Sequence, residues 1–249
     1  MDPLMVSAAS GMRSRMESLD MLANNLANAA TTGYKSDRES YSTYMAAEAL
    51  EAAQAGDSPT PSTLPVIEKN WTDFSQGTLA STGNPLDVAL GTKGFFVVNG
   101  PSGPLYTRNG SFHLSSDGTL STQDGYAVQD TSGTAIQATG VGPIEIAGDG
   151  TVSQGGAALG QLAVATLPQG TADKAGGNYY RQAGAQAQPN PATDVQVYQG
   201  KLEASNVATP ETAVRLVSML RQFEMLQKAA NLGAEMDQRA IQDVAKVNP

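Results

Sequence analysis

The residues that could carry catalysis or hold a metal ion are few. The chain has one histidine, His113, and no cysteine, so it lacks the Cys/His clusters that bind zinc. His113 lies in an alternating, strand-like run, where a lone histidine is more often a packing or surface residue than a general base. Asp117 and Asp124 could form a carboxylate pair for sugar hydrolysis. Each of them precedes a glycine, so turn formation explains both aspartates better.

Motifs of nucleotide-binding proteins and hydrolases are also missing. The glycine-containing runs at 91–94 and 140–142 lack the spacing of phosphate-binding and dinucleotide-binding loops, and neither precedes a predicted helix. The chain contains no Gly-x-Ser-x-Gly motif for a nucleophilic serine. We therefore expect no enzyme activity, no metal site and no cofactor, and the function must depend on how the chain folds and assembles.

Glycine and proline distinguish the two ends of the chain from its centre. Residues 1–50 and 201–249 hold only three of the 26 glycines and three of the 13 prolines. The ends are therefore typical of helices, whereas the centre is typical of short strands joined by turns. A chain with an apolar helix at each end and a folded body between them is suited to assembly with other chains.

The negative charge lies in the centre. The formal net charge is −9, and residues 51–200 carry twelve acidic and five basic side chains, whereas the two ends are near neutral. An acidic body repels nucleic acid and anionic membranes, so we expect neither as a partner. No run approaches the roughly 18 apolar residues of a membrane span, so no membrane insertion is expected. Residues 1–20 lack a basic region before an apolar core, which predicts no cleaved secretory signal.

The N-terminal region shows a heptad-like apolar pattern. The spacing alternates between four and three residues over about three heptads, which is near the minimum for a coiled coil. On periodicity alone, an ordinary amphipathic helix packed on its own domain is the simpler explanation. Gly33 follows the pattern and is predicted to be the C-cap of this helix. The pattern consists of Met5, Ala9, Met12, Met16, Leu19, Ala23 and Leu26.

The C-terminal helix is predicted to begin at Thr209. Thr209 is a suitable N-cap, Pro210 fits the first helical position, and Glu211 lies in the first turn. The apolar pattern runs over about 30 residues or more, which corresponds to about 45 Å of helix. One small β domain cannot cover so long a helix, so the stripe must pack on the N-terminal helix, on another copy, or on both. The stripe consists of Leu216, Met219, Leu220, Phe223, Leu226, Ala230, Ile241 and Val244.

The centre is predicted to be an all-β domain of antiparallel hairpins. Short β-branched and aromatic runs alternate with Asn-Gly and Asp-Gly pairs, which favour tight turns. The similar runs at 117–121 and 149–153 are explained better by shared turn chemistry than by an internal repeat or a calcium site. The turn pairs begin at Asn99, Asn109, Asp117, Asp124 and Asp149.

We expect four consecutive stretches along the chain. The two ends each supply one helix of a paired-helix domain, and the last stretch begins with a strand. The stretches are 1–35 for the N-terminal helix, 36–83 for an extended connecting region, 84–195 for the all-β domain, and 196–249 for the strand and C-terminal helix.

Several motifs resemble those of a known family. Residues 23–35, ANNLANAATTGYK, resemble the N-terminal signature of flagellar rod and hook proteins over thirteen consecutive positions. Further motifs follow in the family's order, and 36–70 and 155–195 are the least similar parts. The compact centre and the run RQFEM at 221–225 resemble the proximal rod type, with the distal rod type as the runner-up. The further motifs are NPLDVAL at 84–90, GFFVV at 94–98, YTRNGSF at 106–112, DGTL at 117–120 and GKLEASNV at 200–207.

The resemblance implies a structural subunit of the flagellar basal-body rod that performs no catalysis. The implied fold is a mainly β central domain flanked by N- and C-terminal α-helices that pair as a coiled coil. Copies would polymerise helically into a hollow shaft that transmits torque and lines the export channel. The implied partners are other copies of the chain, other flagellar rod and hook subunits, and the flagellar export apparatus. The implied location is the periplasmic rod of the basal body, reached without cleavage of a signal peptide.

The resemblance also implies which residues form the assembly interface. Apolar side chains would pack between helices, and three asparagines would make buried amide hydrogen bonds that fix the register, although ordinary polar-face asparagines remain an alternative. Two other functions stay open: a secreted β-rich binding module with helical oligomerisation ends, and a hydrolase with a carboxylate pair. The implied interface residues are Met5, Met12, Met16, Leu19, Asn24, Asn25, Leu26, Asn28, Leu216, Leu220, Phe223 and Leu226.

Overall fold

The chain folds into two compact units, each built from segments that are distant in sequence. The structure is a computed structural model that describes residues 3–45, 63–168, 170–183, 190–192 and 194–247. The division of the chain into four consecutive stretches, expected from the sequence, stays a prediction. The first unit, called here the helical unit, draws on Met1–Ala27, Asp37–Asp73 and Ala208–Pro249, and the second, called the β body, draws on Asn28–Ser36 and Phe74–Val207.

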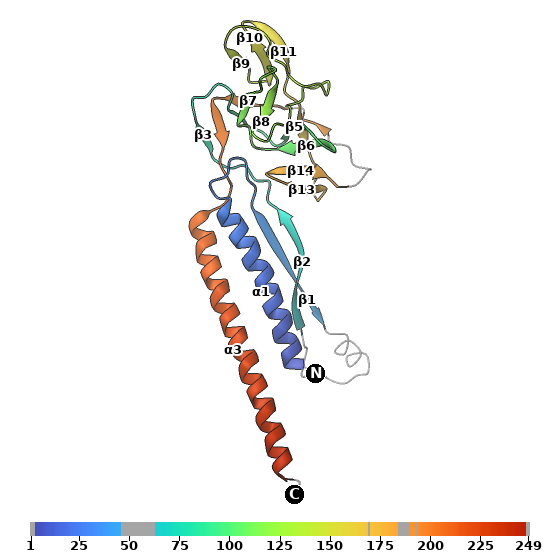
Figure 1. Cartoon of the computed structure of the whole chain (residues 1–249), viewed down its shortest axis with the longest axis vertical. Helices are drawn as coiled ribbons and strands as arrows, with labels where there is room; N and C mark the ends of the chain where they lie inside the picture. Colours follow the sequence, from blue (N-terminus) through green and yellow to red (C-terminus); the bar gives the residue numbers. More distant parts are fainter. Residues whose placement is uncertain (1–2, 46–62, 169, 184–189, 193, 248–249) are drawn as a thin grey trace. The chain divides into compact units, whose positions relative to one another are not determined.

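The helical unit combines two long helices with a β-hairpin (Figure 1). The first helix, α1, contacts both the second helix, α3, and the hairpin formed by β1 and β2. Thr209 begins α3 and Pro210 follows it, as expected from the residues that favour a helix start. The element bounds are α1 Pro3–Ala27, β1 Asp37–Met45, β2 Thr63–Thr72 and α3 Thr209–Val247.

The two helices run antiparallel, as two contacts between them show. A Cβ at Gly11 would lie 3.7 Å from Cδ1 of Leu226, and Nη1 of Arg15 lies 3.5 Å from Sδ of Met219. Residue numbers therefore rise along α1 as they fall along α3. A Cβ at Gly11 would be in ordinary van der Waals contact with Leu226, so α3 lies directly beside α1 at this position.

The buried face of α1 is made largely of small polar residues. Ser14, Ser18, Leu22 and Asn25 are each at most 6% exposed, and their spacing of four, four and three places them on one side of a helix. The Ser18 hydroxyl donates a hydrogen bond to the carbonyl of Ser14, so this buried group is satisfied within the helix. The small side chains let α1 contact α3 and the hairpin at the same time.

The end of α1 differs from the prediction. The helix ends at Ala27, and the amide of Thr31 then donates to the carbonyl of Asn28 in the turn that follows. Gly33 lies six residues beyond the end of the helix, so its prediction as the C-cap is wrong. Its φ of +69° and its contact with another segment, described below, explain why glycine stands there.

The β body consists of short antiparallel strands in several sheets. The largest sheet has the strand order β13-β14-β6-β5-β12-β15, and a three-stranded sheet has the order β11-β10-β9. The prediction of a mainly β body in a chain with a helix near each end is confirmed. The strands are β3 Leu79–Ser81, β4 Val88–Leu90, β5 Phe95–Gly100, β6 Gly103–Thr107, β7 Phe112–Leu114, β8 Leu120–Thr122, β9 Ile144–Ile146, β10 Thr151–Gln154, β11 Ala157–Gln161, β12 Val164–Thr166, β13 Ala172–Gly176, β14 Tyr179–Gln182, β15 Asn190–Pro191, β16 Val197–Gln199 and β17 Lys201–Glu203.

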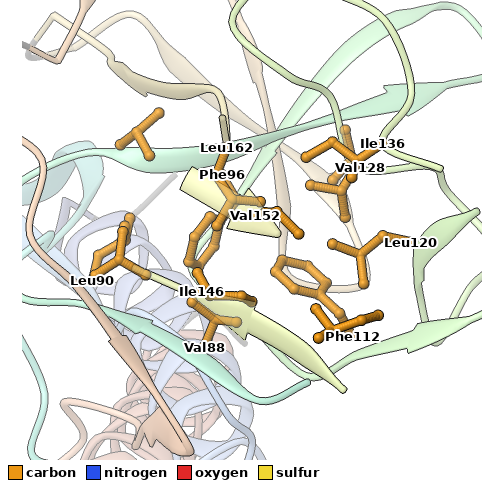
Figure 2. Packing of buried hydrophobic residues seen from close by; sticks show 14 of the residues in the cluster. Val88, Leu90, Phe96, Phe112, Leu120, Val128, Ile136, Ile146, Val152 and Leu162 are labelled. Atoms are coloured by element: carbon orange, nitrogen blue, oxygen red, sulfur yellow. The ribbon is translucent and has the colours of Figure 1, made fainter. Parts of the chain in front are cut away.

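Two apolar clusters form the core of the β body. The larger one includes Phe96 and Phe112, whose ring centroids lie 5.2 Å apart in an edge-to-face arrangement, together with aliphatic side chains from several strands (Figure 2). The smaller one lies around Phe95 and Tyr180. Phe95 and Phe96 are neighbours on β5 and therefore point to opposite faces of the sheet.

The Asp-Gly pairs form turns as predicted, whereas neither Asn-Gly pair forms a hairpin turn: Asn109 and Gly110 lie between β6 and β7, which do not pair with each other. Gly118, Gly125 and Gly150 have φ values of +78°, +83° and +86°, which glycine adopts without strain. Asn99 and Gly100 lie within β5, where Gly100 pairs with Gly103, so the hairpin turn falls at residues 101–102. The turn prediction at Asn99 is therefore wrong, because the following Pro-Ser pair forms the turn instead.

The turn between β10 and β11 consists of two glycines. Gly155 and Gly156 have φ values of +58° and +84°, and a Cβ at Gly156 would have no neighbour within 4 Å. The side-chain oxygen of Gln154 accepts a hydrogen bond from the backbone amide of Gly140, and its side-chain nitrogen donates one to the carbonyl of Gly142. These two bonds join the neighbouring loop to this hairpin. The residue that precedes this turn is therefore anchored to the loop at 140–142.

Candidate assembly surface and buried ion cluster

The side chains considered for catalysis take part in turns and packing. Asp117 accepts hydrogen bonds from the hydroxyl and the amide of Thr119, and these bonds lower the pKa of the Asp117 carboxyl. Asp124 accepts a hydrogen bond of 2.7 Å from the Tyr179 hydroxyl. His113 is half-buried, and its Nδ1 has no hydrogen-bond partner among the described residues. Within the same described ranges, no group of three acidic or histidine side chains could hold a metal ion.

The predicted interface residues of α1 divide into half-buried and exposed positions. Met12, Leu19 and Leu26 are half-buried, whereas Met16 is 53% exposed. Met5 lies in α1, but its side chain is outside the described part of the structure. Met16 therefore remains accessible in the single subunit.

The predicted interface residues of α3 divide in the same way. Leu216, Phe223 and Leu226 are half-buried, whereas Leu220 is 45% exposed. Leu226 lies beside Gly11 of α1, as described above. The half-buried residues therefore belong to the side of α3 that faces α1.

A second apolar stripe runs along α3 and is exposed. Its four members lie within about 40° of one another around the helix, at 100° per residue. Measured in the same way, they lie roughly opposite Phe223 and about a right angle away from Leu226. This surface is called here the outer stripe. It consists of Val214, Met225, Leu232 and Met236, which are 71%, 62%, 60% and 70% exposed.

Of the three predicted asparagines, Asn25 is the buried one. Its amide donates a hydrogen bond of 2.8 Å to the carbonyl of Asp37 and accepts one of 2.9 Å from the Asp37 amide. Asn25 therefore binds α1 to the first residue of β1. Asn24 is exposed and Asn28 is half-buried, and the Asn28 side chain accepts a hydrogen bond from the Thr31 hydroxyl. A role for any of them between subunits stays a prediction.

The β body contains a buried ion cluster that centres on Glu203. One carboxylate oxygen of Glu203 accepts hydrogen bonds from Nζ of Lys35 and from the Gly77 amide, the latter at 2.9 Å. The other oxygen lies 3.0 Å from Nη1 of Arg108. The side chains of Lys35 and Glu203 are 0% exposed, and that of Arg108 is 3% exposed. Charged groups are rarely buried so completely unless they are paired.

Backbone carbonyls also accept hydrogen bonds from both cations. Nζ of Lys35 donates to the carbonyl of Ser75 at 2.6 Å, and Nη2 of Arg108 donates to the carbonyl of Thr92 at 2.8 Å. The guanidinium of Arg108 also lies 5.6 Å from the ring centroid of Phe95. Burial lowers the pKa of Arg108, and its ion pair with Glu203 opposes this change.

Two glycines allow the segments of the cluster to approach one another. A Cβ at Gly33 would lie 2.5 Å from the carbonyl carbon of Arg108, and a Cβ at Gly77 would lie 2.0 Å from the carbonyl oxygen of Ala204. The Gly33 amide also donates a hydrogen bond of 2.7 Å to the carbonyl of Glu203. No larger residue fits at either position without a shift of the backbone.

Sequence reasoning missed the ion cluster and the outer stripe. Lys35, Arg108 and Glu203 each lie in a quoted motif, but they are far apart in sequence, and nothing in the spacing indicates that they meet. The outer stripe was detectable, because an apolar residue recurs at helical spacing on a second side of α3. The buried face of α1 was hidden because its serines do not count as apolar.

Comparison with known proteins decides the family. The chain is 34% identical over 232 residues to the flagellar basal-body rod protein FlgF of Caulobacter vibrioides, a match that covers 92% of this chain and 93% of the relative. The chain belongs to the flagellar basal-body rod protein family. It is also 32% identical to FlgF of Rhizobium meliloti, over 83% of each chain. It is 30% identical to FlgG of Bacillus subtilis, over 94% of this chain and 96% of that relative.

Family models match three parts of this rod-family chain. Residues 5–35 match the flagella basal body rod protein model, residues 89–154 match the D1 domain of flagellar hook protein FlgE/F/G, and residues 198–243 match the C-terminal model of the flagellar basal body rod FlgEFG proteins. The family prediction is thus confirmed, with FlgF and FlgG among the relatives. Neither α1 nor α3, in the part of the chain that the structure describes, is apolar enough to cross a membrane.

Proposed function

We propose that this chain is a structural subunit of the flagellar basal-body rod and that its copies polymerise helically through their helical units. The relatives named above are rod proteins, which supports the first part of the proposal. The outer stripe of α3 carries the second part. A soluble protein rarely leaves a long apolar stripe exposed on a helix unless another molecule covers it.

In this proposal the two sides of α3 have different partners. The side with Phe223 and Leu226 packs on α1 of the same subunit, and the outer stripe packs on a helix of a second copy. Met16 of α1 provides a further exposed apolar contact. The outer stripe of one copy binds a different surface on the next copy. Two bound copies therefore still have one free outer stripe and one free target surface, so further copies can add and form a helical filament.

The finer parts of the proposal follow the family resemblance. The helical units pair as coiled coils and line a central channel. The subunits reach the periplasm through the flagellar export apparatus without cleavage of a signal peptide, and they bind other rod and hook subunits at the ends of their own segment. The proximal, FlgF-like position in the rod is preferred over the FlgG-like distal position.

The outer stripe can be tested by replacing its four residues with glutamine. In a strain that lacks the native gene, we expect the variant Val214→Gln, Met225→Gln, Leu232→Gln, Met236→Gln to fold but not to restore swimming, with incomplete rods in electron micrographs of basal bodies. The matched control is Met225→Leu with Met236→Leu, which keeps the surface apolar and should restore both. Complete rods and normal swimming with the glutamine variant would refute assembly through this stripe.

The same strain separates the rod function from the main alternative. A secreted β-rich binding module would not be needed to build the basal body. Complete basal bodies and unimpaired swimming in the strain without the gene would therefore favour the binding module and reject the rod subunit.

A further inference from the structure

The ion cluster joins three parts of the chain that are far apart in sequence. Glu203 is 168 residues from Lys35 and 95 residues from Arg108. The three residues also fall one in each of the three ranges that match the family models. The closing of loops this long is entropically unfavourable, so contacts of high sequence separation form late in folding.

The segment at 28–36 is joined to the rest of the β body at this cluster, and also where the Asn178 side chain donates a hydrogen bond of 2.9 Å to the carbonyl of Thr32 and where Nζ of Lys174 lies 4.8 Å from the Tyr34 ring. Lys35 and Gly33 both bond to Glu203, the first to its carboxylate and the second to its carbonyl. The amide of Ser36 donates to the side chain of Asn206 at 2.8 Å. These bonds connect residues 33–36 to Glu203 and Asn206, which come much later in the chain.

Burial of Lys35 depends on the carboxylate of Glu203. An ammonium group that is taken out of water without a counter-ion is strongly destabilised, and the same holds for the guanidinium of Arg108. Before Glu203 is in place, water is the more favourable environment for both cations. Without Glu203 the segment 28–36 lacks its two bonds to that residue, and the unpaired charge of Lys35 favours the undocked state.

We propose that Glu203 is a latch that closes the β body last. Until the segment around residue 203 is in place, residues 28–36 stay undocked, although most of the larger apolar core, which lies between residues 88 and 164, can already form. The β body therefore closes only when nearly the whole chain is available. This proposal concerns folding order and does not depend on the rod function.

The first test compares hydrogen exchange in the full-length chain and in Glu203→Gln by mass spectrometry. The loss of a buried ion pair through removal of one partner increases the opening equilibrium by on the order of a hundredfold to a thousandfold. We expect peptides from 28–36 to exchange faster by about this factor, whereas peptides from β5 and β10 change little. Equal protection of 28–36 in both proteins would overturn the proposal.

Two further variants keep this test decisive. Glu211→Gln makes the same chemical change at an exposed ion pair, Glu211 with Arg215, and should leave the exchange of 28–36 unchanged. If Glu203→Gln does not fold, Lys35→Met replaces it, because this variant keeps the pair of Arg108 and Glu203. Faster exchange of 28–36 in Lys35→Met supports the latch, and unchanged exchange overturns it.

The second test follows the order of folding in the native chain. The full-length protein is unfolded in urea and refolded, and hydrogen-exchange pulses are applied at increasing times. We expect 28–36 to become protected in the same late phase as 201–206, after peptides from β5 and β8. Protection of 28–36 before 201–206 would contradict the latch.

Discussion

Replacement of Asn25 by alanine should release the start of the β1–β2 hairpin from α1. Asn25 is 4% exposed, and its amide bonds to both the carbonyl and the amide of Asp37 at 2.8 and 2.9 Å. Alanine favours the helix but provides neither bond. The effect should therefore appear in the hairpin and not as a loss of helix.

The expected cost follows from these two hydrogen bonds. Each bond contributes about 0.5–1.5 kcal/mol net, and Asp37 is only partly accessible to water that could replace Asn25. We therefore expect the free energy of unfolding of the helical unit to fall by about 2 kcal/mol. With a urea dependence of about 1–3 kcal/mol/M, the unfolding midpoint should fall by about 1 M.

The single tryptophan of the chain provides the assay. Trp71 lies on β2 directly opposite Arg38, and the Arg38 guanidinium lies 5.8 Å from its ring centroid. Urea unfolding followed by Trp71 fluorescence therefore reports the part of the hairpin that Asn25 holds. The control is Asn24→Ala, at the exposed neighbouring position, which should change the free energy by less than about 0.5 kcal/mol. An equal effect of the two substitutions would refute the assigned role of Asn25.

Three further outcomes follow from the described contacts. Gly77→Ala should prevent stable folding of the β body, since its Cβ would lie 2.0 Å from the carbonyl oxygen of Ala204, and a soluble variant with a native melting temperature would contradict this contact. Gly233→Ala should stabilise α3 by about 1 kcal/mol, because a Cβ there meets nothing within 4 Å and alanine favours a helix, and a lower melting temperature by circular dichroism would argue against it. Asp117 and Asp149 have pKa values lowered by hydrogen bonds from the side chains and amides of the threonines two residues later. Because these pKa values are lower in the folded chain, the stabilisation is present above the unfolded pKa, near 3.9, and is lost as the pH falls through the folded values. Carboxyl NMR titrations should show both values below 3.8, and replacement of both residues by asparagine should weaken the loss of stability in acid.

The elements that depend on local signals could be predicted from the sequence. Thr209 and Pro210 predict the start of α3, and the Asp-Gly pairs predict their turns, because each of these preferences acts within a few residues. The prediction failed where a neighbouring signal was stronger, as at Asn99, where Pro101 and Ser102 form the turn. It also failed at Gly33, which is needed for contact with Arg108 and not for the end of α1.

The parts that depend on distant contacts could not be predicted. Charge and spacing do not reveal that Lys35 and Glu203 meet, because the contact depends on the complete path of the chain. The buried face of α1 shows a related difficulty. Ser14 and Ser18 are polar, yet they are buried because small side chains let α1 pack closely against its neighbours. A pattern of small residues, read together with the apolar pattern, would have indicated this face.

The two-glycine turn between β10 and β11 offers a place to label the subunit. Gln154 and Ala157 still pair across the hairpin on either side of it, so a short peptide inserted between Gly155 and Gly156 leaves the ladder intact. The positive φ values already suit a chain that leaves the sheet, and Gly156 has open space around it. An epitope or dye-binding tag at this turn would make individual subunits visible in cells without altering either helix.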